Sequence, residues 1–361
     1  MDQIVVNYEG RPCYTIDLTN DFNHLSNMFH SLDTTNHKVC IVSDSTVAPL
    51  YLEKVKEILK DCVKEVISFT FPAGEQSKNL DVIYEIYDTL IQAKFDRKDL
   101  LVALGGGVVG DMTGFAAATY LRGIRFVQIP TTLLSMVDSS IGGKTGVDFK
   151  AYKNMVGAFH QPSAVYMNLT VLKTLTEEQY RSGIGEIVKH ALIRNVEYYQ
   201  WLIDHSTQVM DRDLAAVKDM VYESLLIKKA VVEKDPKELG ERALLNFGHT
   251  LGHAIEKQMN FQMLHGDCVA VGIVCASYIS YKRGHISLQE LEGIKELLST
   301  FTLPIHVDLK DTNAVIETTA SDKKMEAGKI KFILLERIGT AIIDTTVTKE
   351  EMLEAISNCL S

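Results

Sequence analysis

The pattern of apolar and polar positions divides the chain into two parts. Residues 1–17 alternate apolar and polar positions around a Gly-containing turn at residues 8–11, which predicts a hairpin at the edge of a sheet. Short apolar runs then alternate with amphipathic segments as far as Pro130. The predicted strands are residues 38–43, 66–69, 100–104 and 124–129, and predicted helices end at Leu59 and cover residues 82–93. This alternation is typical of a parallel sheet with crossover helices.

Beyond about residue 175 the strand-like runs almost vanish, and helical periodicity predominates. The predicted helices are residues 177–195, 198–209, 214–233, 251–258, 269–283 and 288–300. We therefore predict an α/β plus α fold. Residues 1–175 form an α/β domain with a mostly parallel sheet, and residues 176–361 form a helical domain.

Composition narrows the class of protein. The formal net charge of -10 argues against a general nucleic-acid binder, because phosphate backbones attract positive surfaces. The amino terminus lacks the basic start and apolar core of a signal peptide, and the apolar run at residues 268–281 is shorter than the ~20 residues of a membrane span. The six cysteines show no Cys-x-x-Cys spacing and resemble reduced packing residues. We expect a cytoplasmic protein with no nucleic-acid or membrane partner.

Three of the 11 histidines lie within residues 249–265. His249 and His253 are four positions apart, so a helix over residues 251–259 projects them from one face, and His265 follows a loop-like interval. Imidazoles that converge from a helix and a following turn commonly hold a divalent transition metal. The alternative is three structural histidines.

A glycine-rich segment follows the predicted strand at residues 100–104. Residues 105–110, GGGVVG, fit the pattern G-x-G-x-x-G and lead into a predicted helix at 111–119, whose first amides can bind a pyrophosphate. The acidic residue expected about 20 positions later, to hold a ribose, is missing. Asp44, at the end of an earlier strand, is placed to bind the ribose instead. The alternative is a tight turn between strand and helix.

A loop-rich span around residues 138–154 holds a candidate anion pocket. Its segment SSIGGKT is not a P-loop, because Asp138 stands where the motif requires Gly and no apolar strand precedes it. The candidate pocket residues are Asp138, Lys144, Lys153 and Asn154. A solvated surface loop is the alternative.

Charged residues also recur on the predicted helices of the second part. Glu186 and Lys189 are three positions apart on one helical face, either as a functional pair or as a surface ion pair. Lys228 and Arg242 are further helical cations, which are usually solvated.

Six segments taken together resemble the 3-dehydroquinate synthase family of sugar-phosphate cyclases. In chain order they are GGGVVGDMTGFAAATYLRGI, QIPTTLLSMVDSSIGGKTGVD, KNMVGAFHQP, GEIVKHALI, LNFGHTLGHAIE and LHGDCVAVGI. The family is similar in fold to glycerol and iron-dependent alcohol dehydrogenases, with a nucleotide-binding α/β domain before a helical domain. Two departures are small: Gly185 stands where the family usually has alanine, and Ser182 where some members have asparagine.

The resemblance implies NAD as a catalytic cofactor and one divalent metal, zinc or cobalt. The implied metal ligands are Glu186, His249 and His265. The implied NAD contacts are Asp44, Glu75, Lys78, Gly106, Gly107, Val108, Asp111, Thr131, Thr132 and Lys153. The implied substrate contacts are Arg122, Asp138, Lys144, Asn154, Glu186, Lys189, Lys228, Arg242, Asn246 and Lys324 or its neighbour Lys323. The implied proton-transfer residues are His253 and Glu238, with Lys189 as a further catalytic residue.

The implied reaction belongs to the shikimate pathway of aromatic amino acid biosynthesis. It converts 3-deoxy-D-arabino-heptulosonate 7-phosphate to 3-dehydroquinate and phosphate by transient oxidation at C5, phosphate elimination, reduction and an aldol closure. A homodimer is also implied. Alternatives are a cyclase of the 2-deoxy-scyllo-inosose synthase type, a metal-dependent polyol dehydrogenase and a non-enzymatic binding protein. The cationic pair Lys228 and Arg242 favours a substrate with a carboxylate in addition to a phosphate.

Overall fold

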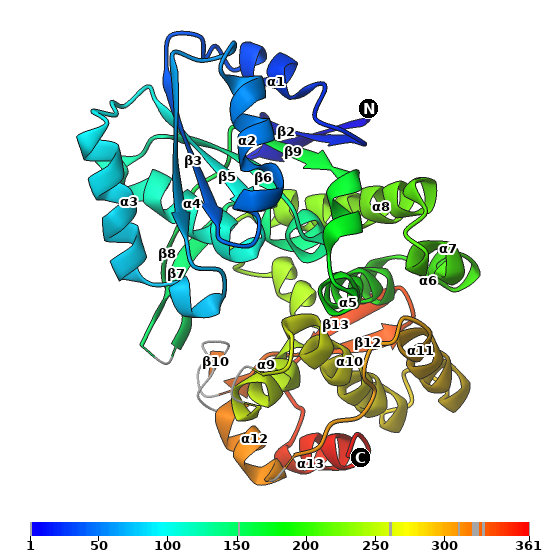
Figure 1. Cartoon of the computed structure of the whole chain (residues 1–361). Coiled ribbons are helices and arrows are strands. Elements are labelled where there is room, and N and C mark those ends of the chain that lie inside the picture. Colours follow the sequence, from blue (N-terminus) through cyan, green and yellow to red (C-terminus); the bar gives the residue numbers. More distant parts are fainter. Residues whose placement is uncertain are drawn as a thin grey trace. The chain divides into compact units, whose positions relative to one another are not determined.

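A mostly parallel sheet with strand order β1-β2-β9-β6-β5-β3-β4 organises the first of two units, Met1–Thr174 (Figure 1). The structure is a computed structural model that describes residues 2–150, 152–259, 262–309, 311–319, 325–326 and 329–360. The strands of this sheet are β1 (Asp2–Tyr8), β2 (Arg11–Thr19), β3 (Lys38–Asp44), β4 (Glu65–Phe71), β5 (Leu100–Gly105), β6 (Arg125–Pro130) and β9 (Ala164–Asn168). β1 pairs antiparallel with β2 at the edge, and the other pairs are parallel. The predicted edge hairpin and parallel sheet are confirmed.

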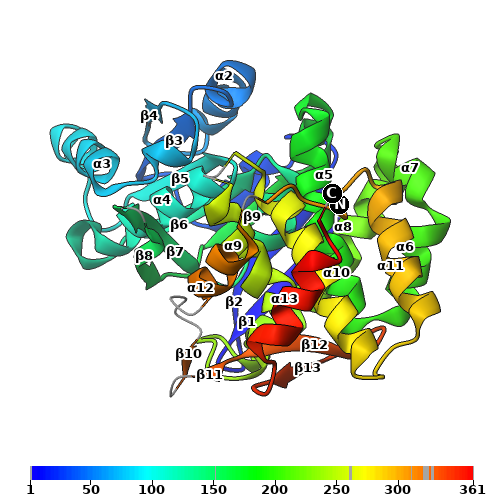
Figure 2. The same ribbon diagram turned by 90° about the horizontal axis from the view of Figure 1, so that it is seen from below.

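Helices cover both faces of this sheet. They are α1 (Leu25–Ser31), α2 (Ala48–Leu59), α3 (Leu80–Gln92) and α4 (Gly107–Thr119). The chain passes from β3 to β4 toward the edge of the sheet and returns past β3 to β5. Because both crossovers are right-handed, these opposite directions place α2 and α3 on opposite faces of the sheet (Figure 2). Ile86 of α3 and Met112 of α4 share one core with Leu101 of β5.

The antiparallel hairpin of β7 (Lys144–Phe149) and β8 (Tyr152–Phe159) occupies part of the span that we expected to be loop-rich. Its sequence is interrupted by glycines and lacks a clean alternation. Packing decides its conformation instead: Thr145 of β7 lies so close to Gly114 of α4 that a Cβ on the glycine would be 2.4 Å from the threonine methyl group. Context of this kind overrides weak strand propensity.

The second unit, Leu175–Ser361, is mostly helical, as predicted. Its helices are α5 (Glu177–Arg194), α6 (Val196–Asp204), α7 (Ser206–Met210), α8 (Leu214–Lys234), η5 (Glu241–Asn246), α9 (His249–Gln258), α10 (His265–Lys282), α11 (Leu288–Thr300), α12 (Thr312–Thr319) and α13 (Lys349–Ser357). Its strands, which were not predicted, are β10 (Met325–Glu326), β11 (Lys329–Ile330), β12 (Phe332–Arg337) and β13 (Thr340–Asp344). The buried helix α10 lies centrally and contacts α5, α9, α11 and α13 (Figure 2). Among the described residues, we find no helix with the length and apolarity needed to cross a membrane.

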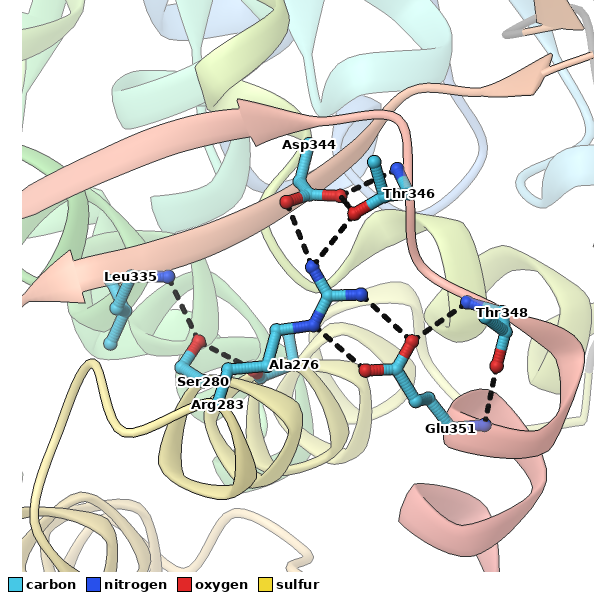
Figure 3. A network of polar contacts seen from close by, with 8 residues as sticks. All are labelled: Ala276, Ser280, Arg283, Leu335, Asp344, Thr346, Thr348 and Glu351. Atoms are coloured by element: carbon cyan, nitrogen blue, oxygen red, sulfur yellow. Dashed lines mark hydrogen bonds and ion pairs between the residues drawn. The ribbon is translucent and has the colours of Figure 1, made fainter.

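Arg283 joins the end of α10 to the carboxyl-terminal elements (Figure 3). Its guanidinium donates two hydrogen bonds to the Glu351 carboxylate of α13, at 2.7 and 2.8 Å, and a third to Asp344 of β13 at 2.8 Å. Nearby, the hydroxyl of Ser280 accepts the amide proton of Leu335 on β12 at 3.0 Å. These contacts fix the last elements of the chain against the central helix.

Candidate functional site

Three helices of the second unit bring one carboxylate and two imidazoles together. Glu186 lies in α5 and is fully buried, His249 is the first residue of α9, and His265 is the first residue of α10. Glu186 Oε1 is 3.4 Å from His249 Nε2 and 3.6 Å from His265 Nε2. Tetrahedral ligands at ~2.1 Å from a metal are about 3.4 Å apart. The Glu186 oxygen therefore lies at the spacing of a fellow ligand from each of the two imidazole nitrogens.

The two oxygens of Glu186 differ in their surroundings. Oε2 accepts a hydrogen bond from the buried ammonium group of Lys189, whereas Oε1 is buried without a hydrogen-bond partner among the described residues. Burial alone would raise the pKa of Glu186, but Lys189, His249 and His265 outweigh it and hold that pKa well below its usual range. An ionised, buried oxygen without a hydrogen bond is costly, and a cation beside it would remove that cost.

A second possible ligand set shares two of these residues. His249, His253 and His265 each offer a nitrogen within 4.8 Å of the others. The His253 ring centroid is 5.1 Å from that of His249 and 5.6 Å from that of His265. Only the third ligand differs between the two sets. Glu186 Oε1 lies 3.4 and 3.6 Å from the two imidazole nitrogens and is buried without a hydrogen-bond partner among the described residues.

Close contacts between helix backbones hold this arrangement. A Cβ on Gly266 of α10 would lie 1.9 Å from the carbonyl oxygen of Ser182 on α5, and the amide of Gly266 donates to the Ser182 hydroxyl at 3.1 Å. Similarly, a Cβ on Gly272 of α10 would lie 1.9 Å from the carbonyl oxygen of Gly248, which precedes α9. Only glycine permits such approaches, so α10 contacts both neighbouring helices through main-chain atoms.

Each imidazole has an acceptor near its second nitrogen. His249 Nδ1 is 3.1 Å from the backbone oxygen of Phe247, and His265 Nδ1 is 3.6 Å from Glu256 Oε2. Burial would lower the pKa of His265, but Glu186 and Glu256 outweigh it and raise that pKa to about 9. Sequence reasoning assigned no role to Glu256. Its position three residues after His253 and seven after His249, on the same helical face, was the available signal.

The remaining predicted residues of the second unit lie on several elements. Lys189 on α5, Lys228 on α8 and Arg242 in η5 are buried cationic residues. The Arg242 guanidinium donates to the Pro236 backbone oxygen at 2.7 Å. Asn246 donates to Glu238 Oε1 at 3.1 Å, which brings these two predicted residues together. Lys323 and Lys324 lie outside the described residues.

In the first unit, the predicted nucleotide residues follow the carboxyl ends of adjacent parallel strands. Asp44 ends β3, Lys153 lies in β8, and the segments carrying the others follow β4, β5 and β6. They are Glu75 and Lys78 after β4, Gly106, Gly107, Val108 and Asp111 after β5, and Thr131 and Thr132 after β6. The strand order reverses between β3 and β5, the position at which open α/β sheets bind ligands.

Gly106 and Gly107, at the start of α4, have more room around their backbone than Gly105, which precedes them. A Cβ on Gly105 would lie 2.5 Å from the Val109 side chain, so this glycine serves packing. At Gly106 and Gly107 the nearest atoms, on Thr132 and Ser139, are 3.1 and 3.3 Å away. The first amides of α4 follow this point, and helix starts favour anions.

Ion pairs connect the predicted residues around this helix. Lys78 donates to Asp111 Oδ2 and to Asn154 Oδ1, both at 2.7 Å, and Lys153 is 3.5 Å from Glu75. Burial would lower the pKa of Lys78, but the carboxylates of Asp111 and Glu75 outweigh it and raise that pKa. Lys78 therefore remains an ammonium group, which links the loop after β4 to α4 and to the hairpin.

Three predicted substrate residues of the first unit lie on separate elements. Arg122 is exposed in a turn where Leu121 and Arg122 both have positive φ, of 51° and 70°. Asp138 lies in a short helical segment, Ser135–Ser139, and Lys144 is the exposed first residue of β7. Positive φ at two consecutive residues with side chains is strained, and such strain often marks functional segments.

The chain is similar to known proteins over nearly its whole length. Family models for the 3-dehydroquinate synthase N-terminal and C-terminal regions match residues 68–182 and 183–325. A 3-dehydroquinate synthase from Acetivibrio thermocellus is 42% identical over 357 residues, which cover 99% of this chain and 98% of that protein.

Solved structures resemble the whole chain. A 2-epi-5-epi-valiolone synthase from Streptomyces hygroscopicus, with NAD+ and Zn2+ bound, has a TM-score of 0.89 and 27% identity, covering 98% of each chain. A 2-deoxy-scyllo-inosose synthase with carbaglucose-6-phosphate, NAD+ and Co2+ has a TM-score of 0.90 and 24% identity, covering 99% of this chain and 100% of that one. Because the 2-deoxy-scyllo-inosose synthase is only 24% identical, its similarity to this chain shows the fold alone.

Proposed function

Because the chain belongs to the 3-dehydroquinate synthase family, we propose that it converts 3-deoxy-D-arabino-heptulosonate 7-phosphate to 3-dehydroquinate and phosphate. The enzyme is then a carbon–oxygen lyase of the shikimate pathway. The observation that carries this proposal is the 42% identity to a protein of that name over 99% of the chain. The buried Glu186 facing His249 and His265 supports it chemically.

NAD and one divalent cation, zinc or cobalt, are the proposed cofactors. The 2-epi-5-epi-valiolone synthase of similar structure holds NAD+ and Zn2+. When bound, NAD supplies a reversible hydride acceptor, and the cation supplies a Lewis acid that lowers the pKa of an alcohol and polarises a carbonyl.

Glu186, His249 and His265 are the proposed metal ligands. Their separations of 3.4 and 3.6 Å and the buried Glu186 oxygen that lacks a hydrogen bond support this set over the three-histidine set. One carboxylate and two imidazoles are a common ligand set of catalytic zinc, and three protein ligands leave a position for substrate. His253 then remains beside the centre as a proton-transfer residue.

The first unit is the proposed NAD-binding domain. Its support is the convergence of the predicted residues other than Lys153 after four neighbouring parallel strands, next to the glycines at the start of α4. The proposed NAD residues are Asp44, Glu75, Lys78, Gly106, Gly107, Val108, Asp111, Thr131, Thr132 and Lys153.

The proposed substrate carries a carboxylate and a phosphate, and cations are proposed to bind both. Lys189, Lys228 and Arg242 are buried, where attraction to an anion is stronger than in water. The other proposed substrate residues are Arg122, Asp138, Lys144, Asn154, Asn246 and Lys324. Glu238 is a proposed proton-transfer residue, and its hydrogen bond from Asn246 holds its carboxylate in place.

A homodimer in the cytoplasm is the proposed state of the enzyme. Large apolar side chains on the hairpin β7–β8 are exposed, which is the surface chemistry of a protein interface. They are Phe149, Tyr152, Met155 and Phe159. The six free cysteines fit a reducing compartment.

Phosphate release tests the reaction. The holoenzyme is mixed with the heptulosonate phosphate or with glucose 6-phosphate, with and without a metal chelator, while NADH absorbance is recorded. We expect chelator-sensitive phosphate release from the heptulosonate without net NADH. Release from glucose 6-phosphate alone would instead indicate an inosose-type cyclase, and accumulating NADH without phosphate would indicate a polyol dehydrogenase.

A further inference from the structure

The two imidazoles that face Glu186 differ in what lies beside their other nitrogen. For His249 it is a neutral backbone oxygen, that of Phe247, at 3.1 Å from Nδ1. For His265 it is the carboxylate of Glu256, at 3.6 Å from Nδ1. Glu256 is only 5% exposed, so its charge is held away from water. The motif-derived roles leave this carboxylate unused.

Glu256 reaches His265 from a different helix. It lies on α9, whereas His265 begins α10. Nδ1 and Nε2 of His265 thus face two different carboxylates, Glu256 and Glu186, each at 3.6 Å. A shortening of about 0.5 Å brings the Glu256 contact into hydrogen-bond range.

We propose that Glu256 is a positioning residue of the metal centre, whose carboxylate accepts the Nδ1 proton of His265 and leaves Nε2 to the cation. This inference rests on the proposed function. A carboxylate behind a metal-bound histidine fixes its tautomer and ring orientation and makes it a more basic ligand, and loss of such a group typically costs 10–100-fold in metal affinity. The backbone oxygen of Phe247 performs the orienting task for His249 without adding charge.

Metal affinity of the full-length apoprotein tests the inference. Zn2+ is titrated against a chromogenic chelator for the wild-type chain, Glu256→Gln and Glu256→Ala. We expect affinity to fall by about 10-fold for Gln, whose amide oxygen still accepts a hydrogen bond, and by about 100-fold for Ala. Lys257→Gln is the matched control, because Lys257 is an exposed neighbour on α9 whose replacement also removes one charge. Its affinity should stay within about 2-fold of the wild type.

Spectra of the Co2+-loaded proteins provide a readout besides affinity. Both Glu256 variants should change the visible absorption bands of bound Co2+, because the His265 ring is no longer fixed, whereas Lys257→Gln should not. Wild-type affinity and spectra in Glu256→Ala would overturn the inference and leave the proposed function intact. If the wild-type chain bound no Zn2+ or Co2+, the proposed function itself would fail. Should neither variant fold, Glu256→Asp replaces them, and wild-type affinity with its shorter side chain would overturn the inference.

Discussion

The proposed nucleotide-binding residues of the first unit and the proposed metal ligands of the second are positioned by different physical means. In the first unit, separate loops follow adjacent parallel strands, and the strand order brings their residues to one edge of the sheet. In the second, the proposed ligands lie within or at the start of three helices, and glycine contacts between main chains set the spacing of those helices. A substitution in one loop at the sheet edge should therefore leave the other loops in place. A substitution at a contact between the helices should displace all the proposed metal ligands together.

The largest effect should follow loss of one metal ligand. His249→Ala should reduce turnover by roughly 10³-fold or more, because a catalytic cation contributes several kcal/mol of transition-state stabilisation. Metal content should fall, while NAD affinity, measured by fluorescence titration, should change little. A variant that kept its metal and its full activity would refute the ligand assignment.

Gly266 of the second unit and Gly106 of the first differ in what an added methyl group would contact. Gly266→Ala places a methyl group against the Ser182 carbonyl oxygen and should destabilise the fold by about 3 kcal/mol and weaken Zn2+ binding. Gly106→Ala meets only the Thr132 side chain, at 3.1 Å, and should cost less than about 1 kcal/mol. It should weaken NAD binding by roughly 10-fold, because its backbone must approach the pyrophosphate.

Urea unfolding, Zn2+ titration and NAD titration of both glycine variants make this comparison. Equal losses of stability would contradict the distinction between the two units. So would a Gly266→Ala chain with wild-type Zn2+ affinity.

Loss of a cationic side chain that is proposed to bind the substrate should reduce catalysis but not cofactor binding. Arg242→Ala should lower kcat/KM by about 10²-fold, because substrate positioning is lost, with NAD affinity little changed. Initial rates over a range of heptulosonate concentrations, together with an NAD titration, provide the measurement. A large loss of NAD affinity would count against a substrate role for Arg242.

The smallest effect concerns the contacts of Arg283, which follows α10 at the end opposite to His265. Hydrogen bonds from Arg283 lower the pKa of Glu351, so its ionised form stabilises the folded state by about 1 kcal/mol at neutral pH. This contribution is complete above the ordinary glutamate pKa of about 4.3 and is lost as the pH falls through the lower folded pKa. Glu351→Gln should therefore be less stable than the wild type in urea at pH 7, and the difference should shrink near pH 3. A difference that grew on acidification would oppose this account.

The sequence predicted the sheet, the helical second unit and the family, because strong apolar periodicity and several motifs agree with one another. It did not predict the hairpins β7–β8 and β12–β13, where packing against neighbouring elements decides the conformation. Spacing alone paired His249 with His253. Spacing did not connect Glu186 with these histidines, because it lies on α5, 63 or more positions away in sequence, and contacts between helices leave no periodic signal.

The partner of Glu256 also could not be read from the sequence. Its place on the helical face of His249 and His253 is readable from the sequence, but its partner His265 begins a different helix. Roles for individual residues therefore need the tertiary structure, even where the family is evident from motifs.

The main-chain contact at Gly266 has a consequence for suppressor genetics. The atoms nearest an added methyl group belong to the Ser182 carbonyl, which every amino acid possesses. A replacement at Gly266 should therefore have no simple second-site suppressor among its contacts. At Gly106 the nearest atom is the Thr132 methyl group, which Thr132→Ser deletes. Revertants of the two substitutions should consequently differ. Those of a Gly266 variant should restore glycine at that position, whereas those of a Gly106 variant should include compensating substitutions at other positions.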